Sequence, residues 1–263
     1  RYIVLKIREY ARPRTLDEAY RLCTGKKNAV IGGMLWLKMQ DKAVNTAIDL
    51  QDLGLDKIEK TESGWRIGAM VTLRDLELSA ELDALTGGAV KESVRHIVGV
   101  QFRNLATVGG SLWGRYGFSD VLTLFMALDA KVELYSRGIV DIETFAEMPT
   151  SEKDLLLSVT IPYNCGSCAY LSQRNISTDF PVLTCALCKD PADGSLRCAV
   201  GARPGRAVLL RSLPADADEA AGYAAGKISF GGNIRGSEEY RRQICRVLVR
   251  RAIRQLEEVQ PCR

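Results

Sequence analysis

The sequence has one histidine and no long apolar run. His96 stands alone among 263 residues, so this chain holds no two-histidine zinc-protease helix, and a catalytic triad could use only that residue. Its place before the loop at residues 101–106 favours the end of a helix over a position beside a cofactor. The longest nearly apolar stretch, residues 121–128, is far below the roughly 20 residues that span a bilayer. We therefore expect no membrane span.

A strong charge of one sign is also lacking. The chain has 36 basic and 32 acidic residues and a formal net charge of +4, without a long run of like charges. Such a balance does not indicate nucleic-acid binding unless basic residues cluster, so we expect no nucleic-acid partner. Residues 1–14 contain no continuous apolar stretch of the kind that a secretory signal needs, and the cytoplasm is the expected compartment.

The composition is otherwise that of a globular protein. Hydrophobic residues make up 46% of the chain and charged residues 26%, which are near globular averages. The length exceeds that of most single domains, so we expect two or three packed subdomains. Short strands and capped helices alternate up to about residue 130, strand-like stretches follow up to residue 200, and residues 237–259 have helical spacing. This order predicts an α+β fold with a boundary near residues 162–167.

Two glycine pairs are the first features with a chemical meaning. Gly32-Gly33 follows the short apolar strand at residues 29–31, and Gly109-Gly110 follows Thr107-Val108, which also reads as a strand. Such turns let the backbone take positive φ values and approach a ligand with unblocked amide donors, which suits a pyrophosphate. Neither pair fits the Rossmann or P-loop fingerprint. Each pair alone is more often an ordinary turn, but together they suggest two halves of one nucleotide site.

The motifs around these turns share their order with one known family. They are Arg12-Pro13, Glu18-Ala19, Ile31-Gly32-Gly33, Ile48-Asp49-Leu50, Ile67-Gly68-Ala69, the block Gln101-Phe102-Arg103-Asn104-Leu105-Ala106-Thr107-Val108-Gly109-Gly110-Ser111, Ser119-Asp120, Leu128-Asp129-Ala130 and Arg235-Gly236-Ser237-Glu238-Glu239-Tyr240. Together they resemble the FAD-binding medium subunit of molybdenum hydroxylases, the family of xanthine dehydrogenase and carbon monoxide dehydrogenase. The resemblance covers essentially the whole chain, and the block at residues 101–111 is its most diagnostic part.

The resemblance implies a fold and a function. Residues 1–163 would form an FAD-binding domain of the PCMH type, with lobes of about 1–58 and 59–163, and residues 164–263 a C-terminal flavoprotein domain of antiparallel strands and helices. The chain would be an oxidoreductase subunit that passes electrons from iron-sulfur clusters through FAD to NAD or another acceptor. Its partners in a heterotrimer would be a small subunit with 2Fe-2S clusters and a large molybdopterin subunit that oxidises the substrate.

The same resemblance, carried over position by position, implies which residues contact FAD. The first turn would hold the pyrophosphate and the adenine side, and the second turn would hold the pyrophosphate. Asp120 would accept hydrogen bonds from ribityl or ribose hydroxyls, and Leu156 would contact the flavin. The expected FAD-binding residues are Val30, Ile31, Gly32, Gly33, Met34, Leu35, Trp36, Thr107, Val108, Gly109, Gly110, Ser111, Asp120 and Leu156.

The chain departs from the family pattern in three places. Met34-Leu35 stands where many relatives have Thr-Asp, and Leu171-Ser172 stands where relatives often have a lysine. Arg115-Tyr116 replaces small polar residues and is a candidate contact for flavin or a partner. These departures leave the flavin potential and the electron acceptor open. They also leave open a flavin-free subunit that acts as a scaffold.

Four cysteines suggest a different kind of site. Cys165 and Cys168, with Cys185 and Cys188, have the spacing of a four-thiolate zinc ribbon. However, Cys185 and Cys188 fall in a strand-like run, where residues three apart point to opposite faces, and cysteine is often a small buried hydrophobe. We therefore predict no metal ligands in this chain. A zinc-binding structural module stays as the alternative function.

Overall fold

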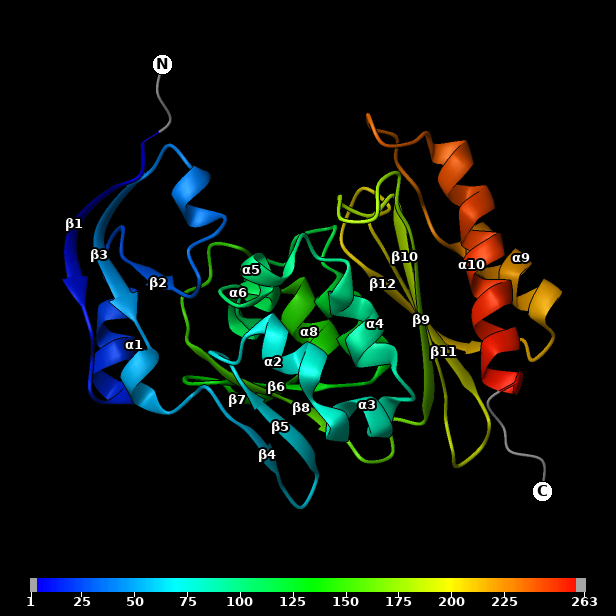
Figure 1. The fold of residues 1–263 in the computed structure, drawn as a ribbon, viewed down its shortest axis with the longest axis horizontal. Helices are drawn as coiled ribbons and strands as arrows, with labels where there is room; N and C mark the ends of the chain where they lie inside the picture. Colours follow the sequence, from blue (N-terminus) through cyan, green and yellow to red (C-terminus); the bar gives the residue numbers. More distant parts are fainter. Residues whose placement is uncertain (1–3, 259–263) are drawn as a thin grey trace.

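The structure, a computed structural model, describes residues 4–258. Its three sheets follow one another along the chain, and Figure 1 shows them side by side from the blue N-terminal lobe to the orange and red C-terminal helices. None of the helices within residues 4–258 is both long and apolar enough to cross a membrane.

The first lobe is a small parallel sheet with one helix. Its strand order is β1-β3-β2, and neighbouring strands run parallel. The hydroxyl of Thr15 accepts a hydrogen bond from the amide of Glu18 and so caps the start of α1 (Leu16–Thr24). Buried Ala19 of α1 packs beside Ile48 of the sheet. The strands are β1 (Lys6–Ala11), β2 (Ala29–Ile31) and β3 (Ala43–Asp49), with 3-10 turns at Leu37–Met39 and Gln51–Leu53.

The second lobe is an antiparallel sheet under a layer of short helices. The strand order is β4-β5-β8-β6-β7, and Figure 1 shows the helices above it. Every residue of α7 is buried, so this helix is the centre of the lobe. The strands are β4 (Ile58–Lys60), β5 (Gly64–Gly68), β6 (Lys131–Leu134), β7 (Gly138–Asp141) and β8 (Leu156–Pro162). The helices are α2 (Leu73–Leu78), α3 (Ala80–Thr86), α4 (Ala89–Arg95), α5 (Val100–Arg103), α6 (Val108–Trp113), α7 (Asp120–Ala127) and α8 (Ile142–Glu147).

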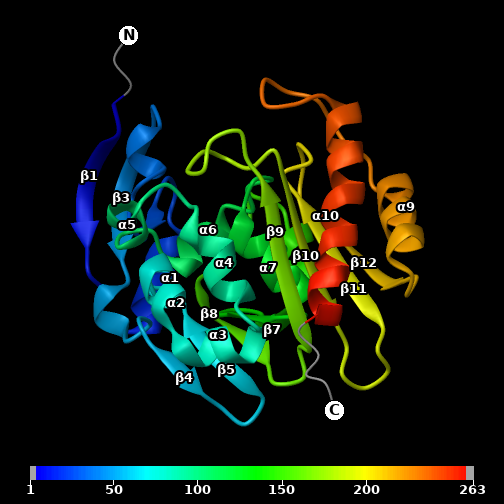
Figure 2. The same ribbon diagram turned by 45° about the vertical axis from the view of Figure 1, so that its right-hand side comes forward.

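The third part is a four-stranded antiparallel sheet between two sets of helices. Its order is β12-β11-β10-β9, and Figure 2 shows α9 and α10 on one face with α4 and α7 toward the other. The residues of β10 alternate between a core shared with the second lobe and a core under α9 and α10. The elements are β9 (Ser167–Gln173), β10 (Leu183–Lys189), β11 (Leu196–Gly201), β12 (Val208–Leu213), α9 (Ala217–Lys227) and α10 (Glu238–Glu258).

These elements confirm the α+β prediction, with local errors. The expected loop at residues 101–106 begins inside the helix α5, and β12 lies beyond the strands expected up to residue 200. The predicted strand at Thr107-Val108 is wrong, because Thr107 is the N-cap of α6 and its hydroxyl accepts the amide of Gly110 at 3.1 Å. The β-branched pair resembles a strand in sequence, but a threonine three residues before Gly110 satisfies the first turn of a helix. The second glycine pair therefore lies inside a helix and does not follow a strand.

Candidate functional site

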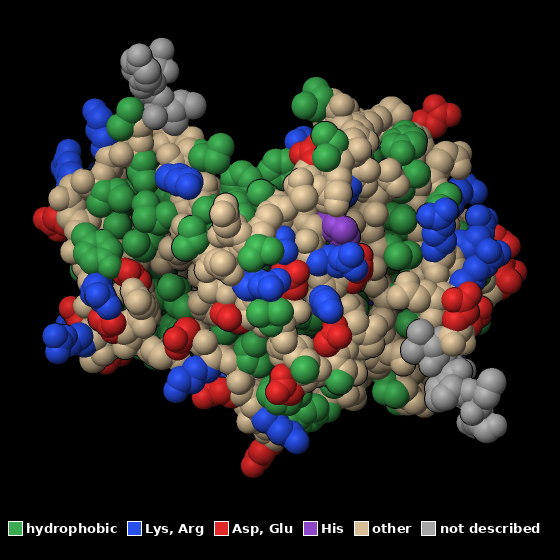
Figure 3. Space-filling view, in the orientation of Figure 1, with side chains coloured by type: hydrophobic (Ala, Val, Ile, Leu, Met, Phe, Trp, Pro, Cys, Tyr) green, Lys and Arg blue, Asp and Glu red, His purple; other side chains and the backbone are tan. Residues whose placement is uncertain are grey.

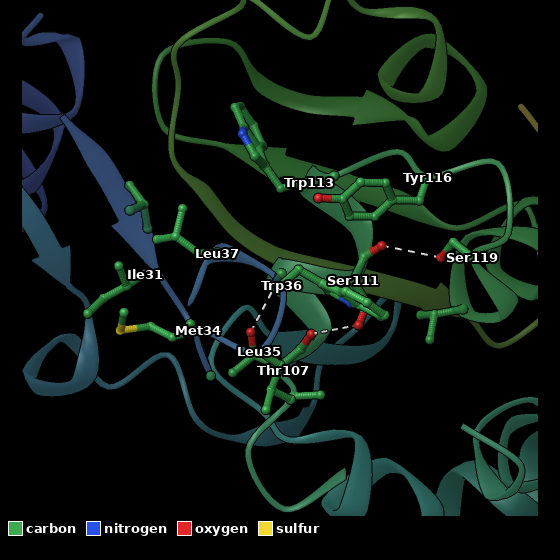
Figure 4. A pocket seen from close by; sticks show the side chains of 18 of the residues that line it. Ile31, Met34, Leu35, Trp36, Leu37, Thr107, Ser111, Trp113, Tyr116 and Ser119 are labelled. Atoms are coloured by element: carbon green, nitrogen blue, oxygen red, sulfur yellow. Dashed lines mark hydrogen bonds between the residues drawn. The ribbon is translucent and has the colours of Figure 1, made fainter. Parts of the chain in front are cut away.

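A cavity of about 770 Å³ lies where the first and second lobes meet. Figure 4 shows Ile31 and Met34 of the first lobe across the cavity from Trp113 and Tyr116 of the second. The loop after β9, at residues 178–181, forms a further part of the wall. In Figure 3 the outline is hollowed between the first lobe and the rest of the molecule, and hydrophobic side chains lie at the base of that hollow.

The two glycine turns touch each other at this cavity. A β-carbon at Gly33 would overlap the carbonyl oxygen of Leu105, and one at Gly32 would overlap the hydroxyl of Thr107. The close approach of the first turn to residues 105–107 therefore requires glycine at both positions. The expected positive φ values do not occur at the glycine pairs, and the left-handed residue of the first turn is Met34, at φ 58°.

The first turn offers a run of free amide donors. No described residue accepts a hydrogen bond from the amides of residues 32–35. Successive amides in a turn make a concave site for an anion. The glycine amides of the second turn are already bonded within the protein, since Gly109 donates to the carbonyl of Ala69 and Gly110 to the Thr107 hydroxyl. The expectation that both glycine pairs present unblocked amides is thus corrected for Gly109 and Gly110.

Aromatic side chains from all three parts gather on one side of the cavity. The ring centroid of Trp36 lies 5.4 Å from that of Phe180 and 6.0 Å from that of Phe118. Tyr116 stacks on Phe118, with centroids 5.2 Å apart. Such faces suit planar ring systems. The sequence prediction included Trp36 but missed Phe180, which follows no motif and comes to the cavity only through the fold.

Asp120 is the buried acid of the cavity. Ser119 caps α7 through the amide of Leu122, which places Asp120 in the first turn, where it is 5% exposed. Oδ1 of Asp120 accepts a hydrogen bond from the hydroxyl of Tyr170 at 2.6 Å and forms an ion pair with Arg174. Burial raises the pKa of Asp120, although the charge of Arg174 and the Tyr170 hydroxyl act in the opposite direction.

The structure brings nearly all the predicted site residues to this one cavity. Val108 is the exception, since it is fully buried in the core and does not line the cavity. The predicted residues that line it are Val30, Ile31, Gly32, Gly33, Met34, Leu35, Trp36, Thr107, Gly109, Gly110, Ser111, Asp120 and Leu156. Arg174 also lines the cavity but was not among the predicted site residues. It stands two residues after Ser172, near the position where relatives often have a lysine.

Two other predicted candidates have different outcomes. Tyr116 lines the cavity, whereas Arg115 points into the core with its guanidinium 5.1 Å from the ring centroid of Trp113 and 5.2 Å from that of Phe145. His96 ends α4 and does not line the cavity, and its Nδ1 lies 3.2 Å from the hydroxyl of Ser177. The predicted helix-end position of His96 is confirmed.

The four cysteines of the zinc alternative do not converge. Cys165, Cys168 and Cys188 belong to the core shared with the second lobe, whereas Cys185 lies on the other face of β10, with its Sγ 3.8 Å from that of Cys198. Strand residues three apart do point to opposite faces, as expected. Within residues 4–258, no group of three or more His, Cys, Asp or Glu side chains is placed to hold a metal.

The cavity fits a flavin dinucleotide in size and chemistry. Ligand sites typically enclose about 300 to 1,000 Å³, and this one encloses about 770 Å³. FAD joins two planar ring systems through sugar-type hydroxyls and a pyrophosphate. The free amides of residues 32–35, the acid Asp120 and the aromatic wall around Trp36 match those three kinds of group.

Comparisons with known proteins agree with this chemistry. The family described as "FAD binding domain in molybdopterin dehydrogenase" matches residues 5–164. An uncharacterized protein of Escherichia coli K12, YgfM, is 27% identical over 92% of this chain and 94% of its own length. The nicotine 6-hydroxylase medium subunit of Paenarthrobacter nicotinovorans is 27% identical over 93% of this chain and 95% of its own.

The fold has close structural neighbours. A chain of the Cu,Mo-CO dehydrogenase superimposes with a TM-score of 0.86 over 97% of this chain and 99% of its own, at 23% identity. The resemblance predicted from residues 101–111 and the other motifs is therefore confirmed. The chain belongs to the family of FAD-binding domains of molybdopterin dehydrogenases, as the FAD-binding subunit of a molybdenum hydroxylase-type oxidoreductase.

Proposed function

We propose that this chain holds FAD between its two N-terminal lobes and carries electrons from 2Fe-2S clusters on a small subunit to NAD or another acceptor. Substrate oxidation would take place at a molybdopterin centre on a large subunit, within a heterotrimer. The observation that carries the proposal is the meeting of the two glycine turns at a single cavity with four free amides and a buried acid. The medium-subunit name of the nicotine 6-hydroxylase relative supports the place in a multisubunit enzyme.

Each group of cavity residues has a distinct proposed role. The amides of residues 32–35 bind the pyrophosphate, and Asp120 accepts a ribityl or ribose hydroxyl. Leu156 and Trp36 contact the ring systems, and the surrounding apolar wall excludes water. FAD, when bound, supplies reversible hydride and one-electron chemistry, so that the protein's task is binding, orientation and electrostatics.

The side-chain departure at Met34-Leu35 does not remove this site. The free donors of the first turn belong to the backbone, so a missing threonine hydroxyl and aspartate carboxylate leave the proposed pyrophosphate contacts in place. For this reason we favour a flavin-binding subunit over a flavin-free scaffold. No observation among the described residues favours the zinc module.

The proposal extends to the domains and the compartment. We propose an FAD-binding domain at residues 1–163, with lobes of about 1–58 and 59–163, and a C-terminal domain at 164–263. Along the chain, β8 is the last strand of the second-lobe sheet and β9 is the first strand of the C-terminal sheet, which supports this division. All the described cysteines are free thiols, which supports a reducing compartment such as the cytoplasm.

Reduction of the natural complex tests the electron path. The subunits are purified together, and flavin absorbance is followed after addition of candidate heterocyclic or aldehyde substrates and then of NAD or an artificial acceptor. We expect substrate to bleach the flavin band and an acceptor to restore it. A complex that turns over with an artificial acceptor at the large subunit, while its flavin stays oxidised, would contradict the proposed path.

A further inference from the structure

Asp120 receives its hydrogen bonds from the chain that follows residue 164. Its Oδ1 accepts the hydroxyl of Tyr170 at 2.6 Å and forms an ion pair with Nη2 of Arg174. Tyr170 lies on β9, Arg174 directly follows that strand, and Asp120 begins α7 of the second lobe. These two side chains therefore join the C-terminal sheet to the wall of the cavity.

All three groups are shielded from water. Asp120 is 5% exposed and Tyr170 is 2% exposed, and the side chain of Arg174 is 7% exposed. Arg174 is also held at its other nitrogens, since Nε donates to the Ser172 hydroxyl at 3.2 Å and Nη1 donates to the carbonyl of Asp179. A guanidinium fixed at three nitrogens keeps one orientation, so the position of Nη2 is set before a ligand enters.

The second oxygen of Asp120 is left for a ligand. The hydrogen bonds from Tyr170 and Arg174 both go to Oδ1, Oδ2 accepts none from another residue of 4–258, and Asp120 lines the cavity. An ionised carboxylate is an acceptor at both oxygens, whereas a protonated one also donates. Burial raises the pKa of Asp120, and Arg174 and Tyr170 oppose that rise. Without them the buried acid would favour its neutral form.

We propose that Arg174 and Tyr170 are positioning residues that orient the Asp120 carboxyl group so that Oδ2 accepts a ribityl or ribose hydroxyl of FAD. This inference rests on the proposed FAD function and extends it to residues outside the matched segment 5–164. The cofactor site is then completed by the C-terminal domain through these two side chains.

Three roles of Arg174 make different predictions. If Arg174 acts through Asp120, its replacement weakens FAD binding only while the Asp120 carboxylate is present. If Arg174 donated directly to the cofactor, the loss would persist with asparagine at position 120. If it served only to hold the fold together, the melting temperature would fall and FAD affinity would not respond to the residue at position 120.

A double-mutant cycle on the full chain separates these roles. FAD dissociation constants are measured by fluorescence titration for the wild type, Arg174→Gln, Asp120→Asn and the double variant, with thermal melting of each. We expect Arg174→Gln to weaken FAD binding about ten- to hundredfold. In the Asp120→Asn background the same change should weaken it by less than about twofold. Arg174→Lys should restore part of the affinity because it keeps the charge.

Tyr170→Phe gives a second cycle that preserves the packing. It removes a single hydroxyl, and we expect it to weaken FAD binding about two- to tenfold, an effect that again disappears with Asp120→Asn. Arg250→Gln and Tyr163→Phe are matched controls outside the cavity, since they remove an ion pair to Asp218 and a hydrogen bond to the carbonyl of Thr61. Both controls should bind FAD as the wild type does.

Each outcome decides the inference. Full-strength effects of Arg174→Gln and Tyr170→Phe in the Asp120→Asn background would overturn it, as would wild-type FAD affinity in both single variants. In those cases the FAD function itself would stand, because the wild type still binds. A folded wild-type chain that binds no FAD would overturn the proposed function together with the inference. If Arg174→Gln does not fold, the Tyr170→Phe cycle alone supports or overturns the inference.

Discussion

Gly33 lies so close to the carbonyl oxygen of Leu105 that a β-carbon at position 33 would overlap that oxygen. This contact joins the turn after β2 to the segment before α6, and so it joins the first lobe to the second at the cavity. A change at Gly33 must move one turn away from the other. The spacing of the lobes and the shape of the cavity therefore depend on this glycine.

Gly33→Ala should weaken both folding and FAD binding. We expect a loss of about 1–3 kcal/mol in the free energy of unfolding and a fall of at least about tenfold in FAD affinity, measured by denaturant unfolding and fluorescence titration. Gly222→Ala is the matched control. Gly222 lies within α9, and a β-carbon there meets no atom within 4 Å. It should stabilise by about 0.5–1 kcal/mol. Wild-type values for Gly33→Ala would refute the contact.

Val98 stores backbone strain at the edge of the cavity. It has φ 52° and is 44% exposed, and a β-branched residue is poorly suited to the left-handed region. Val98→Asn should therefore raise the free energy of unfolding by about 1 kcal/mol, because asparagine tolerates this conformation and little apolar burial is lost. Val100→Asn, at a similarly exposed valine in α5, should give no gain. Equal effects of the two changes in chemical denaturation would argue against strain at Val98.

Glu77 should contribute stability that is lost in acid. Burial acts to raise the pKa of Glu77, but hydrogen bonds from Arg103 and Arg74 outweigh it, so that the pKa lies below its ordinary value. A depressed folded pKa means that this stability is fully present above about pH 4.3 and falls as the pH drops through the folded pKa. Glu77→Gln should thus be less stable than the wild type at pH 7, and the difference should shrink below about pH 4. A constant difference from pH 7 to pH 3 would contradict this assignment.

Removal of metal should have no effect on the fold. Cys185 faces the core under α9 and α10, while Cys188 faces the opposite core, so these thiols cannot share one ion. We expect the same melting temperature before and after treatment with a strong chelator, and no zinc by elemental analysis. A fall in melting temperature that added zinc reverses would restore the alternative of a zinc module.

The sequence indicates the cavity well where a motif occupies one continuous segment. The turns at residues 30–36 and 107–111 were identified because glycine pairs and their neighbours are local signals, and both line the cavity. Asp120 was identified through the family resemblance, in which Ser119-Asp120 is one of the motifs. The strands between residues 130 and 200 were likewise expected from local strand-like stretches, whereas β12 (Val208–Leu213) was not.

The rest of the site depends on contacts between distant segments. Phe180 and Arg174 reach the cavity from the loop after β9, more than 50 residues beyond Asp120, and no local pattern marks either one. Thr107-Val108 was assigned to a strand because β-branched residues favour strands, whereas the capping hydrogen bond of Thr107 decides for a helix. Which amides remain free likewise depends on tertiary hydrogen bonds, such as that from Gly109 to Ala69.

The flavin content of the purified chain tests the central claim most directly. The chain is isolated with its natural partners, its absorption spectrum is recorded, and the flavin is released with acid and identified. We predict a flavin spectrum and about one FAD per chain. A folded, colourless chain that also takes up no added FAD would contradict the account.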